Sequence, residues 1–153
     1  MRSLIHFGGK VWKILPRSWR LLIARATQPK FTVSAAAVIR NDRGEILLLD
    51  HVLRPASGWG LPGGFCKHYE QPDEALRREL FEEAGITISG LEIYRVRTIE
   101  RHVEVIFTAY SSDEPQILSR EITDARWMAP GELPPEMNID QQFLIRRICG
   151  IDI

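Results

Sequence analysis

The chain has 153 residues, which suits one domain of ordinary size and leaves little room for two. Hydrophobic residues make up 44% and charged residues 26%, so a packed core is expected and wholesale disorder is disfavoured. Twenty Lys and Arg residues balance twenty Asp and Glu residues. This zero net charge argues against both a uniformly basic nucleic-acid binder and an acidic solvating protein.

Cysteines and apolar runs give little sign of an extracellular or membrane setting. Cys66 and Cys149 belong to no Cys-x-x-Cys pair, so neither a disulfide framework nor a zinc-finger pattern is present. No apolar run approaches the length of about 18 residues that a membrane-spanning helix needs. The first ten residues also lack the apolar run of a signal peptide. We therefore expect a cytoplasmic, reduced setting.

Residues 1–30 differ from the rest because they contain seven Lys and Arg residues and no Asp or Glu. Apolar residues, two tryptophans among them, are interleaved with these charges. We expect a short helix capped by Ser18 and running to about Ala26. We interpret residues 1–30 as a basic amphipathic N-terminal arm, separate from a domain over residues 31–153.

Three roles fit residues 1–30. The segment can dock on the rest of the chain as a helical cap or a homodimer arm, lie on an anionic membrane, or hold a nucleic-acid backbone such as RNA. Pro16 divides the segment into two short halves, which argues against a strong autonomous membrane helix. Docking is therefore favoured over contact with a membrane or with RNA.

The remaining chain has the pattern of a mixed helix–strand domain. A turn at residues 41–44 joins the first two expected strands, and the apolar run 46–49 indicates a strand that is buried on both faces. A loop over residues 51–60 leads to a sharp turn at residues 61–64. We expect strands over residues 31–39, 45–50, 91–100, 103–110 and 125–128, a loop over residues 111–121, and helices over residues 72–84 and 140–148.

The helix expected over residues 72–84 has clear signals at both ends. Pro72 suits the first helical position, and Asp73 and Glu74 suit the positive N-terminal end of the helix. Gly85 suits the left-handed position that follows the last turn.

Three carboxylates share one face of this helix, since Glu79, Glu82 and Glu83 are spaced i, i+3, i+4. Such a triplet, taken alone, is most simply an exposed acidic face. The adjacent Gly-Gly turn favours a cation site, because Mg²⁺ prefers oxygen ligands and glycine lets the backbone come close. Arg78 can hold a carboxylate in a bidentate pair, and Glu70 lies just before the helix.

Together these residues form a known motif. Gly64, five residues, Glu70, seven residues and then residues 78–86 (Arg-Glu-Leu-Phe-Glu-Glu-Ala-Gly-Ile) match G-x5-E-x7-R-E-U-x-E-E-x-G-U, where U is apolar, at every specified position. Residues 64–86 therefore closely resemble the Nudix box, and the order of elements over roughly residues 31–150 resembles the Nudix fold. The resemblance implies an α/β class fold, an α/β/α sandwich with a mixed β-sheet, preceded by the short helical arm.

Carried over by position, the resemblance implies roles for the residues of the motif. The Gly64 carbonyl and the carboxylates of Glu79, Glu82 and Glu83 resemble the metal ligands of the family. Glu70 and Arg78 resemble the pair that fixes the loop–helix–loop geometry.

Many members of the family use one further glutamate, in a loop before a late strand, as a metal ligand or general base. Glu121 is the first candidate for this role, because it precedes the strand expected over residues 125–128 at a similar spacing, and Glu114 is the second. Arg54, Trp59 and Arg97 are candidates for substrate contacts, since Arg suits phosphates and aromatic rings suit bases.

The resemblance implies a Mg²⁺-dependent hydrolase, with Mn²⁺ as a substitute ion. Its small substrate would be a nucleoside diphosphate linked to another group, as in a nucleotide sugar or an ADP-ribose-like compound. The ion would lower the pKa of a bound water, and Glu82 or Glu121 would accept the proton of that water. Two alternatives stay open: an RNA 5′-pyrophosphohydrolase, motivated by the basic arm, and a non-catalytic nucleotide-sensing module.

Overall fold

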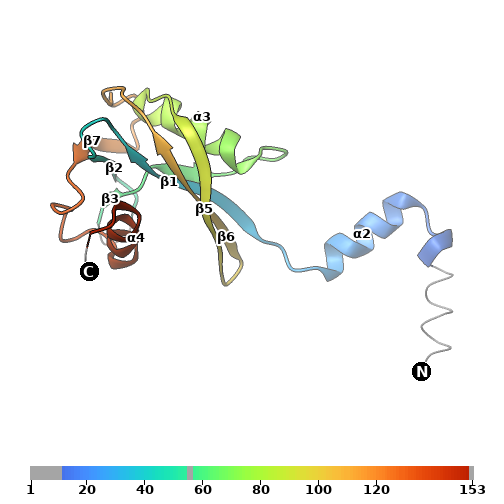
Figure 1. Ribbon diagram of the computed structural model, residues 1–153. Coiled ribbons are helices and arrows are strands. Elements are labelled where there is room, and N and C mark those ends of the chain that lie inside the picture. Colours follow the sequence, from blue (N-terminus) through green and yellow to red (C-terminus); the bar gives the residue numbers. More distant parts are fainter. Residues whose placement is uncertain (1–11, 55–56, 152–153) are drawn as a thin grey trace. The chain divides into compact units, whose positions relative to one another are not determined.

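The structure, a computed structural model, describes residues 12–54 and 57–151 (Figure 1). The chain divides into two compact units between Phe31 and Thr32. The first unit holds helix α2 (Arg17–Thr27), and the second holds the sheet and two further helices. The division lies next to the boundary expected from the charge pattern, while the separate role of the arm stays a prediction.

Helix α2 follows Pro16, which occupies the N-cap position. Ser18 lies inside the helix, and no side chain caps the N-terminus, so the predicted Ser18 cap is wrong. With Pro16 at the N-cap, the helix begins two residues earlier than a Ser18 cap would place it, and the fixed φ of Pro16 sets the direction of entry. The helix ends before Gln28, which is extended, as expected for the residue before Pro29. Within the described ranges, no helix has the length and apolar character needed to cross a bilayer.

The second unit is built on a seven-stranded sheet. The strands are β1 (Thr32–Arg40), β2 (Ile46–His51), β3 (Trp59–Gly60), β4 (Gly63–Phe65), β5 (Ser89–Ile99), β6 (His102–Tyr110) and β7 (Ile122–Met128). The main order is β3-β2-β1-β6-β5, with β4 added to β1 and β7 added to β2. Strands β1 and β6 are parallel and their described neighbours pair antiparallel, so the sheet is mixed, as predicted.

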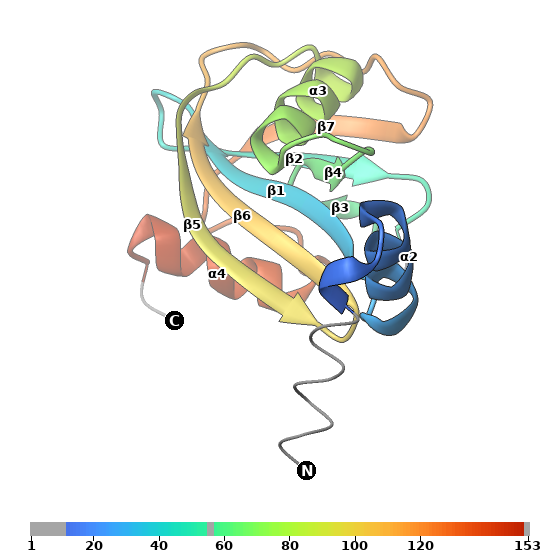
Figure 2. The same ribbon diagram turned by 90° about the vertical axis from the view of Figure 1, so that its right-hand side faces the viewer.

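Helices α3 (Pro72–Ala84) and α4 (Ile139–Cys149) lie on opposite faces of this sheet (Figure 2). Leu76 and Leu80 of α3 pack in one core, and Ile145 of α4 packs in the other. Residues 46–49 are fully buried, with the odd-numbered side chains in the α3 core and the even-numbered ones in the α4 core. The predicted strand buried on both faces and the α/β/α sandwich are therefore confirmed.

Helix α3 begins and ends at the predicted residues. Gln71 and Glu74 form a capping box in which the Gln71 N–H donates to a Glu74 carboxylate oxygen at 3.0 Å. Gly85 adopts the left-handed conformation with φ 65°, so its predicted role as a helix stop is confirmed.

Strands β3 and β4 are the main departure from the expected pattern. The predicted turn at residues 61–64 is partly wrong, because Gly63 and Gly64 lie in β4. This strand pairs with the start of β1, with Ala35 opposite Gly64, and the pairing satisfies backbone groups that a turn would leave to water. The loop expected over residues 51–60 is also shorter, since His51 ends β2 and Trp59 begins β3. Strand β4 therefore fixes Gly64 beside the middle of the sheet.

Candidate active site

Gly64 and Glu79 meet where β4 lies against α3. A Cβ built on Gly64 would lie 2.6 Å from Glu79 Cδ and 2.7 Å from Glu79 Oε1. Only a residue without a side chain lets the Glu79 carboxylate come this close to the backbone of β4. The structure thus makes neighbours of two residues that the sequence predicts as ligands of one metal ion.

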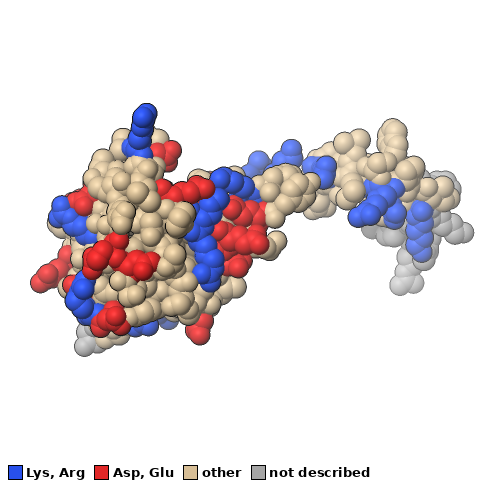
Figure 3. Space-filling model, turned by 90° about the horizontal axis from the view of Figure 1, so that it is seen from above, with Lys and Arg blue, Asp and Glu red and all other residues tan. Residues whose placement is uncertain are grey.

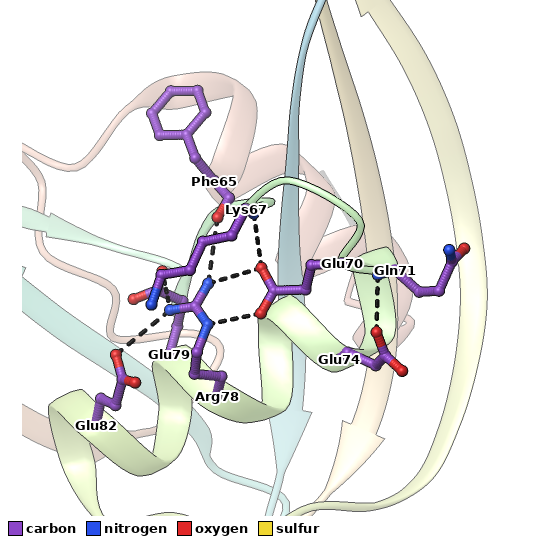
Figure 4. Close-up of polar contacts among 8 residues, drawn as sticks. All are labelled: Phe65, Lys67, Glu70, Gln71, Glu74, Arg78, Glu79 and Glu82. Atoms are coloured by element: carbon purple, nitrogen blue, oxygen red, sulfur yellow. Dashed lines mark hydrogen bonds and ion pairs between the residues drawn. The ribbon is translucent and has the colours of Figure 1, made fainter.

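Arg78 links this strand, the loop after it and α3 (Figure 4). Its Nε donates to Glu70 Oε1 at 2.6 Å and its Nη2 to Glu70 Oε2 at 3.0 Å, which makes a bidentate pair. Nη1 also donates to Glu79 Oε1 at 2.7 Å, and Nη2 to the Phe65 carbonyl at 3.3 Å. Glu70 Oε2 accepts a further hydrogen bond from the Lys67 N–H at 2.7 Å. Arg78 and Glu70 are therefore placed to hold the loop–helix–loop geometry.

The pair stays charged over the ordinary pH range. Hydrogen bonds from Arg78 and from the Lys67 N–H favour the ionised carboxylate and lower the pKa of Glu70 to about 2. The same pairing raises the pKa of Arg78 above its usual value. The contact between loop and helix is thus independent of pH near neutrality.

Glu83 lies one helical turn beyond Glu79 and is only 7% exposed. Its Oε2 atom is buried and has no hydrogen-bond partner among the residues that the structure describes. Burial, and then the charge of Glu79, raise the pKa of Glu83 to about 7. A buried carboxylate oxygen without a partner is costly unless a cation or a proton satisfies it. This oxygen therefore fits a metal ion at the site.

A cavity of about 590 Å³ joins these groups to residues from distant parts of the chain. Its chemically relevant lining is Gly64, Glu79, Glu83, Glu121, His51, Arg54, Glu104 and Gln141. The donors near Glu83 are carboxylate and carbonyl oxygens, which is the ligand chemistry that Mg²⁺ prefers. Within residues 12–54 and 57–151, no three acidic, His or Cys side chains already stand at metal-coordination spacing. One oxygen of the Glu79 carboxylate, Oε1, accepts a hydrogen bond from Arg78.

Glu82 and Glu83, adjacent on α3, have different surroundings. The side chain of Glu82 is 52% exposed, and one of its oxygens lies 3.4 Å from Arg78 Nη1 (Figure 4). Glu82 does not line the cavity. Of the three carboxylates predicted to share one helix face, Glu79 and Glu83 therefore line the cavity, and Glu82 lies at its outer margin.

The two candidates for the additional glutamate are separated by the fold. Glu121 lines the cavity, and its charge contributes to the raised pKa of Glu83. The loop that carries it is fixed because the Glu121 carbonyl accepts a hydrogen bond from the Val52 N–H at 2.9 Å. Glu114 instead lies 3.6 Å from Arg43, is largely exposed and does not line the cavity. The geometry thus favours Glu121 over Glu114 as the additional glutamate of the site.

Arg54 enters the cavity from the loop after β2. Its Nη2 donates to the Leu61 carbonyl at 2.8 Å, while its Nη1 is buried without a hydrogen-bond partner among the described residues. A Cβ on Gly60 would lie 1.9 Å from Nη1, so the absence of a side chain there makes room for the guanidinium. A buried guanidinium N–H group that has no partner among the described residues suits an anionic ligand such as a phosphate.

Trp59 and Arg97, the other predicted substrate contacts, lie outside this cavity. Trp59 packs against the α4 core, with the Arg126 guanidinium 5.8 Å from its ring centre. Arg97 forms an ion pair with Glu104 and lines a second cavity of about 690 Å³, which lies between β5 and α4. Glu104 lines the first cavity, so this ion pair joins a lining residue of one cavity to a lining residue of the other.

Three of the lining residues named above, His51, Glu104 and Gln141, are missed by sequence reasoning. Burial lowers the pKa of His51 to about 4, so its ring is neutral near pH 7. A histidine two positions after the wholly apolar run 46–49, at the end of a buried strand, is the signal that could have identified it. No local signal marks Gln141, which reaches across from α4 to accept a hydrogen bond from the Leu61 N–H at 3.1 Å.

Comparisons with known proteins bear on the family to which the chain is related. The sequence model of one family, described as the NUDIX domain, matches residues 30–148. A MutT-like protein of Streptomyces ambofaciens is 30% identical over 127 residues, which cover 81% of this chain and 79% of the relative. An 8-oxo-dGTP diphosphatase of Haemophilus influenzae is 32% identical over 111 residues, covering 66% of this chain and 82% of the relative.

A solved structure shows the same fold. The NUDIX domain of Shewanella oneidensis NrtR, complexed with ADP ribose, aligns with a TM-score of 0.71 and 22% identity. The alignment covers 88% of this chain and 97% of that domain.

Proposed function

Because the chain belongs to the Nudix hydrolase family, we propose that it is a Mg²⁺-dependent enzyme that hydrolyses a pyrophosphate bond in a nucleoside diphosphate linked to another group. The family assignment confirms the resemblance drawn from residues 64–86. One observation carries the proposal: Glu83 Oε2 and Arg54 Nη1, which have no hydrogen-bond partner among the described residues, belong to residues of one cavity, beside the close contact of Gly64 and Glu79. This cavity offers oxygen ligands to a cation and N–H groups to an anion.

The proposed ion site consists of the Gly64 carbonyl and the carboxylates of Glu79, Glu82 and Glu83. When bound, Mg²⁺ or its substitute Mn²⁺ supplies charge neutralisation for the diphosphate and acidifies the attacking water. Glu70 and Arg78 position these ligands, since Arg78 donates hydrogen bonds both to Glu70 of the loop and to Glu79.

The remaining residues supply substrate binding and proton transfer. Arg54 binds a phosphate oxygen with its free N–H group, and Glu121 accepts the proton of the attacking water. Glu121 is preferred to Glu82 as the base because Glu121 lines the cavity, whereas Glu82 is paired with Arg78 at the margin. Displacement at phosphorus then depends mainly on positioning and electrostatic stabilisation.

The second cavity gives the nucleoside part of the substrate a place next to the diphosphate. Its lining includes the half-exposed rings of Tyr94 and Phe143 and the guanidinium groups of Arg95 and Arg97. Aromatic rings and Arg side chains stack on nucleobases. Nucleotide sugars and ADP-ribose-like compounds fit this pair of cavities, as do nucleoside triphosphates, the substrate class named for the Haemophilus influenzae relative.

The test is a hydrolysis screen with Mg²⁺ on nucleotide sugars, ADP-ribose, 8-oxo-dGTP, dGTP and RNA with a 5′-triphosphate. We expect turnover of at least one compound, abolished by EDTA and largely lost in both Glu82→Gln and Glu83→Gln. Preference for the RNA would favour the RNA 5′-pyrophosphohydrolase, the second candidate that the basic arm motivates. Turnover at wild-type rate in both variants would contradict the proposed site, and tight binding without turnover would indicate a sensor. A homodimer and a cytoplasmic location stay predictions from the sequence.

A further inference from the structure

Helix α2 carries an apolar stripe on one face. Trp19, Leu22, Ile23 and Ala26 are spaced i, i+3, i+4, i+7, which aligns them along the helix. None of the residues of α2 is buried, and Trp19 and Leu22 are 58% and 61% exposed. Large apolar side chains gathered in this way mark an interaction surface rather than a solvated face.

The opposite side of α2 carries its three arginines, with Leu21 and Ala24 among them. Arg17, Arg20 and Arg25 lie away from the apolar stripe at 100° per residue. The first turn of the helix contains no acidic residue, and residues 1–30 hold none at all. In Figure 3 the described part of this unit accordingly shows Lys and Arg among uncharged residues. The helix thus combines two features, a stripe that avoids water and a face that attracts anions.

We propose that α2 binds the surface of a membrane that contains anionic lipids. The helix lies in the interface, with the stripe at the boundary of the acyl chains and the three arginines among the lipid phosphates. Both contributions are needed, because one short stripe or a few charges alone give weak and reversible binding. This membrane role differs from the preference drawn from the sequence, which was for docking on the rest of the chain.

The same observations argue against the other partners. A nucleic acid would engage the arginines but leave the aliphatic side chains of Leu22 and Ile23 in water. A second copy of the helix would cover the stripe but bring two strongly basic segments together. Docking on the second unit would pair the arginines with acidic residues, all twenty of which it contains, whereas an anionic bilayer matches both the stripe and the arginines along the whole helix.

The test uses the full chain in sedimentation with vesicles of phosphatidylcholine, with and without phosphatidylserine, at low and high salt. We expect binding to the phosphatidylserine vesicles that weakens with salt. The stripe variant Trp19→Glu/Leu22→Glu should lose this binding, and Arg17→Gln/Arg20→Gln/Arg25→Gln should weaken it roughly a hundred-fold, since each basic residue contributes separately. The Arg→Lys triple variant keeps the charge and should keep the binding.

The matched control is Ile93→Glu/Ile117→Glu, which places the same charges on residues of the second unit that are 64% and 53% exposed. It should bind like the wild type, and thermal unfolding of every variant shows whether the second unit stays folded. Sedimentation of the stripe variant at the wild-type level would overturn the proposal. An absence of binding to phosphatidylserine vesicles would also overturn it. RNA binding by the wild type that is lost in the arginine variant but kept in the stripe variant would overturn it as well. A dimer in gel filtration that the stripe variant disrupts would assign the stripe to a second copy instead.

Discussion

The side chain of Glu79 fills the space that a Cβ on Gly64 would occupy, with Glu79 Cγ 2.7 Å from that position. The contact brings a carboxylate of α3 against the backbone of β4. Arg78 Nη1 donates a hydrogen bond to an oxygen of the same carboxylate. The position of Glu79 is thus set by a glycine and an arginine together.

Gly64→Ala should displace the Glu79 side chain and lower the affinity for Mg²⁺. Glu79 can shift, so the fold survives with a loss of about 1–3 kcal/mol in the free energy of unfolding. We expect kcat/KM to fall about tenfold or more, as for other changes that misplace a metal ligand. Urea unfolding and Mg²⁺ titration of activity measure the two effects. Gly131→Ala is the control, because a Cβ there meets nothing within 4 Å, and an equal loss in both variants would contradict the argument.

Glu83 should make the metal-free protein less stable as the pH rises. The pKa of this carboxyl is raised to about 7 in the folded state, so the folded protein holds a proton that the unfolded chain releases above about pH 4.5. The resulting loss in the free energy of unfolding is on the order of 3 kcal/mol between pH 4.5 and pH 7. Thermal unfolding in EDTA across this range should show it.

Two comparisons isolate this contribution of Glu83. Glu83→Gln should flatten the part of the stability profile between pH 4.5 and pH 7, because the amide does not titrate. Mg²⁺ should stabilise the wild type more at pH 8 than at pH 5, since it binds the ionised carboxylate. Identical profiles for wild type and variant in EDTA would show that Glu83 keeps an ordinary pKa.

Arg78→Lys should weaken the link between the loop and α3 although the charge is kept. A lysine cannot make the bidentate pair with Glu70, whose two bonds are 2.6 and 3.0 Å long. We expect a lower melting temperature and a fall of about 10–100-fold in kcat/KM. Arg43→Lys is the matched control, because the Arg43–Glu45 pair is exposed and contributes little. Equal activity of the two variants would contradict the proposal that Arg78 positions the loop and α3.

Glu121→Gln should reduce kcat by about a hundred-fold or more, the usual contribution of a general base. Its stability should match that of the wild type, because Glu121 is exposed and its side chain makes no ion pair among the described residues. Glu114→Gln should behave like the wild type, since Glu114 lies with Arg43 away from the cavity. Steady-state kinetics compares both with Glu82→Gln. A near-normal kcat in Glu121→Gln, beside a large loss in Glu82→Gln, would assign the base to Glu82.

The sequence predicts best those features that local signals determine. Helix α3 is specified at both ends by Pro72 and Gly85, and the i, i+3, i+4 carboxylates identify its functional face. Strand β4 is not predicted, because its conformation depends on pairing with β1, about thirty residues earlier in the chain. Gln141 is missed for the same reason, since only tertiary packing brings α4 to Leu61.

The roles of neighbouring residues also depend on burial that a motif does not encode. Glu82 and Glu83 are adjacent and equally acidic, yet one is half exposed and the other is buried. The spacing predicts that both lie near a cation, and only the fold shows which one carries the unpartnered oxygen.

The pairing of β4 with β1 also affects how long the site persists. The Cys66 N–H donates to the Val33 carbonyl at 2.9 Å, which extends the hydrogen bonding between β1 and the segment that carries Gly64. Strand β1 is also paired with β6. Backbone amides that are paired in a sheet are better protected from exchange with solvent than those of a fraying loop. The segment that carries Gly64 should therefore open less readily than the loops around it, a difference that amide hydrogen exchange measures.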